Sequence, residues 1–267
     1  MAKDIAIITI HGMGDTQEDY YKELERKLRK AVGRETWDDR VQLEHVYYQG
    51  LLQGNQEDMW DAMDDEYDLR WDSLRKFMLY AFSDAVAIEH SLHKDKVLYK
   101  AVHQTIANAF DKAYVALGNE AKPVILIAQS LGAQEVSNYI WDAKKNKRFF
   151  EQPGDGDETQ RAFRRLSTCR HFVTTGCNIP LFKSGLNDPQ NFERPNAAFT
   201  WLNFFDRDDV LGYPLRTMAA SFDVDWLEDH AVSVGGFFTG WNPFSHIKYW
   251  SDKDVINPIA EKIKAIL

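Results

Sequence analysis

Ser130 lies between two elements that the sequence predicts. The apolar run Val124–Ala128 predicts a buried strand, and the pattern from Leu131 onward predicts a helix. Small residues, Ala128 and Gly132, stand two positions before and two after the serine, where a tight turn brings the two backbones close together. Such a turn lifts the hydroxyl clear of the sheet for nucleophilic attack, and the helix N-terminus favours a developing oxyanion. The alternative is that Ser130 only caps the helix.

A glycine loop, His11-Gly12-Met13-Gly14, follows the first predicted strand, residues 5–10. Glycines let backbone N–H groups turn across the carboxyl edge of the sheet and approach an anionic oxygen closely. The alternative is a phosphate loop for a nucleotide. The sequence lacks the G-x-G-x-x-G fingerprint and a Walker-type lysine, which disfavours that alternative.

A carboxylate and an imidazole follow in the late part of the chain. Asp206, Asp208 and Asp209 come after a late strand, and Asp209 is favoured because it directly precedes an apolar pair at the turn that leaves the strand. His246 lies in an aromatic loop before the final helix, where it can reach over the sheet edge. Its rival is His230, whose acidic neighbours suit a solvated loop.

These groups need a scaffold, and strands that alternate with helices predict an α/β fold with a mainly parallel central sheet. The run at 5–10 is apolar on both faces, as in the middle of a sheet covered by helices. Residues 56–120 have a helical pattern that is longer than one crossover requires. Residues 142–165 are charged and Gly-rich, and predict an exposed excursion. We expect one domain over residues 1–267, with further strands at 41–48, 171–175 and 199–205 and a closing helix at 254–267.

The composition excludes several classes of protein. Hydrophobic residues make up 44% and charged residues 27% of the 267 positions, which excludes a disordered chain. The net charge of −9 disfavours binding to nucleic acids and anionic membranes. No apolar run is long enough for a transmembrane helix, and no secretory signal is visible, so we expect a cytoplasmic protein. The oligomeric state is not predicted.

The two cysteines, Cys169 and Cys177, suit a reducing compartment and are expected to be inert, semi-buried thiols, with a disulfide between them as the alternative. Neither they nor the histidines have the spacing of a metal site, so no metal and no cofactor are expected.

The chain order serine, aspartate, histidine, with a glycine loop ahead of all three, is the order of one class of serine hydrolase. The segments ITIHGMG, VILIAQSLGA, NFFDRDDVLGYPL and SHIKYW carry this order over nearly the whole chain. With them the sequence resembles the α/β-hydrolase family, specifically its lipase- and esterase-like members. Ala128 stands where the usual G-x-S-x-G motif has its first glycine.

The resemblance implies an α/β-hydrolase fold and a small-molecule acyl substrate. Ser130 would attack the acyl carbonyl, His246 would take its proton, and Asp209 would orient the imidazole. The backbone N–H groups of Met13 and Leu131 would form the oxyanion hole. An acyl-enzyme would then be released by water.

The resemblance also gives the helical segment 56–120 a role, as a partial cover of the active site. The expected substrate-binding residues are Gly12, Gln129, Phe237 and Phe238, the last two in an apolar loop, 232–241, that is a candidate lid. Aromatic and methionine side chains of the helical segment either line an acyl pocket or pack the segment onto the sheet. They are Trp60, Met63, Tyr67, Trp71, Phe77, Met78 and Tyr80. The alternative function is a catalytically silent, hydrolase-like binding module.

Overall fold

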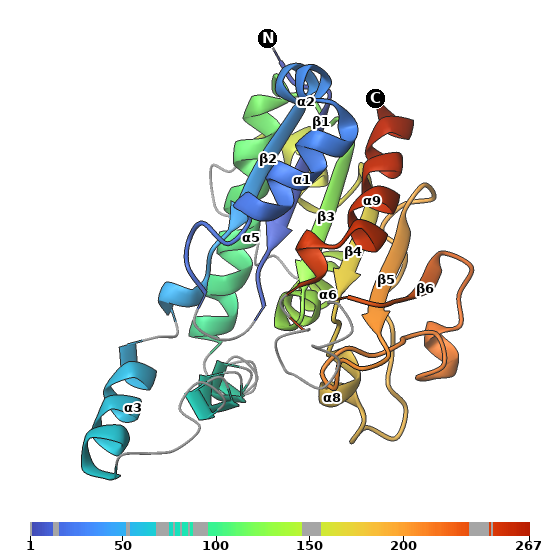
Figure 1. Cartoon of the computed structure of the whole chain (residues 1–267). Coiled ribbons are helices and arrows are strands. Elements are labelled where there is room, and N and C mark those ends of the chain that lie inside the picture. The colour runs from blue at the N-terminus through green and yellow to red at the C-terminus, as the bar shows by residue number, and fades with distance from the viewer. Residues whose placement is uncertain are drawn as a thin grey trace.

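Six parallel strands form the central sheet of the computed structural model, in the order β2-β1-β3-β4-β5-β6 (Figure 1). The predicted α/β class with a parallel sheet flanked by helices is confirmed. The strands are β1 (Ile5–Ile10), β2 (Val41–Val46), β3 (Val124–Gln129), β4 (Cys169–Thr175), β5 (Thr200–Asp206) and β6 (Leu227–Val232). The structure describes residues 2–12, 16–51, 54–67, 75–76, 78–80, 82–84, 86–87, 96–145, 156–234, 246 and 248–267.

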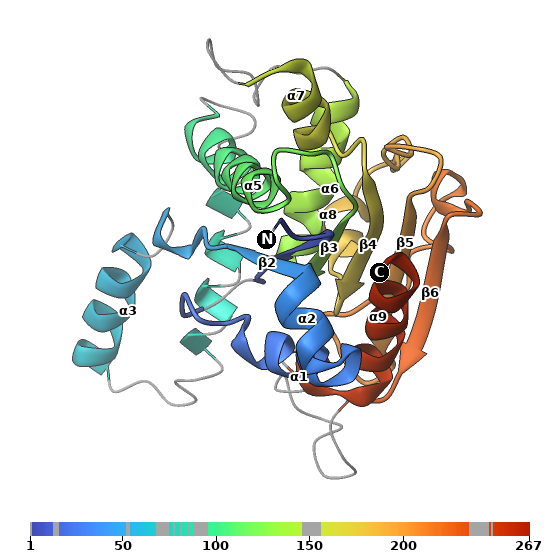
Figure 2. The same ribbon diagram turned by 90° about the horizontal axis from the view of Figure 1, so that it is seen from above.

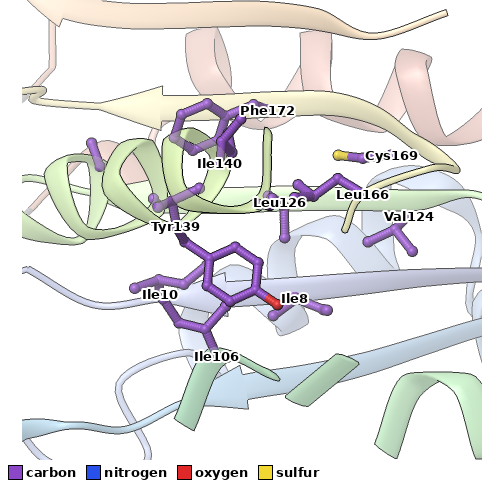
Figure 3. Close-up of a cluster of buried hydrophobic side chains, with 14 of the residues drawn as sticks. Ile8, Ile10, Ile106, Val124, Leu126, Tyr139, Ile140, Leu166, Cys169 and Phe172 are labelled. Carbon is purple, nitrogen blue, oxygen red and sulfur yellow. The ribbon is translucent and has the colours of Figure 1, made fainter. Parts of the chain in front are cut away.

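The central strands are apolar on both faces because each face packs against a different set of helices. In β1, Ile5 and Ile7 belong to one buried cluster, whereas Ile8 and Ile10 belong to the other. This alternation follows from the two-residue period of a strand. Figure 3 shows the second cluster, in which Ile8 and Ile10 lie with side chains of β3, β4 and neighbouring helices.

Two layers of helices cover the sheet (Figure 2). One face carries α1 (Lys22–Val32) and α9 (Lys253–Ile266), which pack against each other. The other face carries α5 (Val97–Ala116) and α6 (Leu131–Lys144). The 56–120 segment contains α3 (Gly54–Tyr67), which lies off the β2 edge of the sheet, as well as α5. Further helices and short 3₁₀ turns in the described ranges include α2 (Arg34–Arg40), η1 (Gln49–Leu51), α7 (Glu158–Arg164), α8 (Ile179–Lys183), η3 (Ala220–Phe222) and η5 (Tyr249–Ser251).

Two expectations about local structure are wrong. His230 lies in the edge strand β6, stacked on Phe204 with ring centroids 4.9 Å apart, and not in a solvated loop. The stretch 142–165 is not exposed throughout: residues 156–159 are exposed, but Phe163 of α7 is fully buried, and residues 146–155 lie outside the described residues. The α7 helix is held because the Arg164 guanidinium forms two hydrogen bonds to the Asp111 carboxylate, 2.6 and 2.7 Å long.

Both cysteines are free and fully buried. Burial raises the pKa of the Cys169 thiol well above its ordinary value and that of Cys177 to about 12, which keeps both protonated near neutral pH. In the part of the chain that the structure describes, no helix combines the length and the apolar character needed to cross a bilayer.

Candidate active site

Ser130 occupies a strained turn at the carboxyl end of β3. Its backbone angles, φ 52° and ψ −122°, lie in a region that residues other than glycine rarely adopt. The serine precedes α6 at the N-cap position, but its hydroxyl makes no capping hydrogen bond. The capping role considered from sequence is therefore absent at this residue, and the strain places a buried hydroxyl where strand and helix meet.

Glycines allow this turn to lie against the loop after β1. A Cβ on Gly132 would lie 2.3 Å from the carbonyl oxygen of His11. A Cβ on Gly12 would lie 2.8 Å from the Cβ of Ser130. Any side chain at either position would push the two segments apart. The first turn of α6 is thereby held against the His11-Gly12 loop, and its N–H groups, beginning with Leu131, have no acceptor within the helix.

His11 anchors that loop and is a structural histidine. Its Nε2 accepts a hydrogen bond from the Tyr48 N–H (3.1 Å), so its Nδ1 carries the proton that is donated to the Gly12 carbonyl (2.7 Å). The Tyr48 ring stacks on the imidazole at 4.1 Å. Burial lowers the pKa of His11 to about 4 although the bond to Gly12 opposes that change, so the ring is neutral near pH 7.

Asp209 and His246 form a buried pair. His246 Nδ1 lies 2.8 Å from Asp209 Oδ2, and their side chains are only 3% and 2% exposed. Tyr249 donates its hydroxyl to the same Oδ2 (2.8 Å), and the Leu211 N–H donates to Oδ1 (3.0 Å). Burial alone would raise the pKa of Asp209, but the hydrogen bonds and charge of His246, with Leu211 and Tyr249, lower it below its ordinary value. The carboxylate is therefore ionised and held in one orientation.

The other candidate acids and the rival histidine make different contacts. Asp206 accepts backbone N–H groups on both oxygens, from Asp208 at 2.9 Å and from Val234 at 2.6 Å. Asp208 itself is exposed. His230 Nε2 lies 3.3 Å from Glu228 Oε2 on the edge strand. Of the three aspartates, Asp209 is the one that contacts His246.

His246 is held close to the Ser130 turn from two sides. Gln129, the residue before the serine, donates its side-chain amide to the His246 carbonyl at 2.6 Å. The Thr175 carbonyl accepts a hydrogen bond from the Ser130 N–H at 3.0 Å. The next residue, Gly176, lies against His246, since a Cβ on it would be 2.8 Å from His246 Cε1. His246 Nε2 is buried and has no hydrogen-bond partner among the described residues. Within the described residues, no protein group therefore competes for this nitrogen.

Asn178 is a site residue that the sequence analysis missed. It is fully buried after β4, and its Nδ2 lies 3.4 Å from Ser130 Oγ. The signal that could have revealed it is its place just after a buried strand, at the same sheet edge as Ser130.

Several predicted site residues lie outside the described residues, namely Met13, Phe237, Phe238, Trp71 and Phe77, together with most of the 232–241 loop. Among the other pocket candidates, Trp60 and Tyr80 are buried, whereas Met78 is 40% exposed.

Within the described ranges, no group of three or more His, Cys, Asp or Glu side chains could hold a metal ion. No protein-family model matches the sequence, and no curated protein matches it either.

Proposed function

We propose that this protein is a serine hydrolase of the α/β-hydrolase fold, which cleaves a carboxylic ester or a related acyl bond. The observation that carries the proposal is the buried Asp209–His246 pair beside the strained Ser130 turn. The three residues come from the ends of β3 and β5 and from the segment after β6, in the chain order serine, aspartate, histidine. The order of the strands in the sheet also agrees with this fold.

In this mechanism His246 Nε2 removes the proton from Ser130 Oγ as the oxygen attacks the acyl carbonyl. Asp209 holds the Nδ1–H tautomer and stabilises the imidazolium that forms. The backbone N–H of Leu131, with that of Met13, donates to the oxyanion, and loss of one such donor costs about 2.7–4 kcal/mol in related chemistry. The imidazolium then returns its proton to the leaving alcohol, and water releases the acyl group.

The alternative is a binding module that has the same fold and no catalysis. One observation favours it: no hydrogen bond joins Ser130 Oγ to His246 Nε2 in the described part of the chain. Hydrogen bonds of a catalytic site are often long in the absence of substrate, so the geometry does not exclude the base role.

Labelling with a fluorophosphonate probe separates the two functions. We expect the wild-type protein to be labelled and to hydrolyse p-nitrophenyl esters, with the best chain length giving the size of the acyl pocket. The Ser130→Ala variant should lose labelling and about 10⁴- to 10⁶-fold in kcat. The matched control is Ser137→Ala, which removes a buried hydroxyl from α6, the helix that follows Ser130, and should be labelled normally. Labelling that persists in Ser130→Ala would exclude Ser130 as the nucleophile.

A further inference from the structure

Asn178 stands at the N-cap position of α8, where asparagine is among the preferred residues. Its side chain makes no capping hydrogen bond to that helix. Instead the side chain is fully buried and turns its Nδ2 toward Ser130 Oγ, 3.4 Å away. Local helix structure therefore does not explain the orientation of this amide.

The other half of the amide is unpaired. Asn178 Oδ1 is buried without a hydrogen-bond partner among the residues that the structure describes. An unsatisfied buried acceptor is costly, and such atoms in a folded protein call for an explanation. Because Oδ1 and Nδ2 share one carbon, Oδ1 also lies close to the serine hydroxyl. The same site holds a second unpaired buried atom, His246 Nε2.

The chemistry of Ser130 favours this orientation of the amide. Its hydroxyl has one proton, which His246 must receive, and two lone pairs, one of which can accept from Asn178 Nδ2. If the amide were reversed, Oδ1 would accept the serine proton in competition with the base. The orientation with Nδ2 on Oγ leaves the proton available and leaves Oδ1 as an open acceptor next to the reacting atom.

We propose that Asn178 is a specificity-determining residue, whose Oδ1 accepts a hydrogen bond from an O–H or N–H group that the substrate carries on the second carbon of its acyl part or of its alcohol part. This inference rests on the proposed hydrolase function and narrows its substrate class to hydroxylated or amidated acyl compounds. The donor can be carried by the acyl part or by the alcohol part of the ester. A site built to satisfy a substrate donor rejects the analogue that lacks it, because its own polar group then stays unpaired.

The test compares two matched ester pairs with the full chain. For the acyl part, the pair is p-nitrophenyl 2-hydroxypropanoate and p-nitrophenyl propanoate. For the alcohol part, it is 2-hydroxyethyl butanoate and propyl butanoate. For each pair, the ratio of the kcat/KM values, hydroxylated ester over its partner, is divided by the ratio of their rates of alkaline hydrolysis. We expect this corrected ratio to be about ten for the wild type in one of the two pairs.

Two variants separate the two halves of the amide. Asn178→Leu removes both, so the preference should fall to about one. Asn178→Asp keeps an acceptor oxygen, so the preference should remain, while kcat falls for both esters because the oxygen that replaces Nδ2 accepts the Ser130 proton in competition with His246. Thermal unfolding of each variant reports whether it folds, and if Asn178→Leu does not, Asn178→Ala takes its place.

The outcomes distinguish this inference from the proposed function. A wild type that is labelled by fluorophosphonate but has the same corrected kcat/KM for the two esters of each pair overturns the role of Asn178 alone. The same holds if Asn178→Leu keeps the preference or if Asn178→Asp loses it. A wild type that is neither labelled nor active on any of the four esters overturns both proposals.

Discussion

At the scale of single residues, Tyr249 connects the two aspartates that compete in the sequence for the role of acid. Its hydroxyl donates to Asp209 Oδ2 and accepts the backbone N–H of Asp206, both at 2.8 Å. Burial, with the charge of Asp209, raises the pKa of Tyr249 far above its ordinary value, so the hydroxyl keeps the proton that it donates. Tyr249 thereby fixes the oxygen that faces His246, and we assign it as a positioning residue.

Tyr249→Phe should lower kcat/KM about 10- to 100-fold, because a hydrogen bond to a charged group is lost. The pKa of Asp209 should rise, since the Tyr249 bond is one of the contacts that lower it. The Asp206 N–H is left unpaired, which should reduce the free energy of unfolding by about 1–3 kcal/mol. Ester hydrolysis measured from pH 4 to 9 checks the first two effects, and urea unfolding checks the third.

The control for this change is Tyr213→Phe. That hydroxyl bonds the Val210 carbonyl at 3.0 Å in the same turn, and it touches neither Asp209 nor His246 in the structure. If both phenylalanine variants behave alike, Tyr249 has no special role in positioning the carboxylate.

At the scale of elements, the sequence predicts five of the six strands of the sheet and misses the edge strand β6. Residues 5–10 and 124–128 form strands as expected because both faces of each are buried. The edge strand β6 has polar residues, and its Asp229 accepts the N–H groups of Leu215 and Arg216. Such a role depends on a contact distant in sequence, and no local pattern reveals it.

The packing of α6 against the end of β1 gives a prediction for this scale. Gly132→Ala should reduce the free energy of unfolding by about 1–3 kcal/mol, because its Cβ would collide with the His11 carbonyl. It should also lower the proposed esterase activity, since the first turn of α6 moves away from the His11-Gly12 loop. Urea unfolding and kcat/KM for a p-nitrophenyl ester measure the two effects.

Gly185→Ala is the matched substitution, since a Cβ there would meet no atom within 4 Å. It should change the free energy of unfolding by less than about 0.5 kcal/mol. Equal effects of the two substitutions would show that steric contact at Gly132 does not hold the site together.

At the scale of the whole molecule, the site exists only when the entire sheet is formed. Ser130, Asp209 and His246 are separated by long stretches of chain and meet at one edge because parallel strands all end there. The sequence order predicts these three residues as the site, since each stands near a recognisable strand or turn, and that assignment stays a prediction. It does not predict Asn178 or Tyr249, whose significance depends on distances that only the folded chain defines.

Stability of the whole molecule should depend on pH through His11. Its pKa is about 4 in the folded protein, against 6.5 ordinarily. Between these values the unfolded chain holds a proton that the folded chain lacks, so acid favours unfolding. The free energy of unfolding should fall by about 1.4 kcal/mol per pH unit from pH 6.5 downward, about 3 kcal/mol in all, and should not change on this account above that pH.

Urea unfolding of the wild type and His11→Gln at several values between pH 4 and 8 measures this dependence. The variant should be less stable at every pH because it loses the hydrogen bonds to Tyr48 and Gly12. The slope of its free energy of unfolding against pH should be smaller by about 1.4 kcal/mol per pH unit, which corresponds to one proton. His171→Gln should also flatten the slope, since burial lowers the pKa of His171 to about 4 as well. A His11→Gln slope equal to that of the wild type would mean that this imidazole is not held neutral by the fold.

The backbone angles of Ser130 have a consequence for how such a chain can change over evolutionary time. A glycine there would relieve a conformation that a serine adopts only at a cost of about 1–3 kcal/mol. Selection for heat resistance alone would therefore favour losing the hydroxyl, and only continued demand for turnover would keep it. Thermostabilised descendants of this protein that carry glycine at position 130 would be expected to have lost the proposed hydrolase activity.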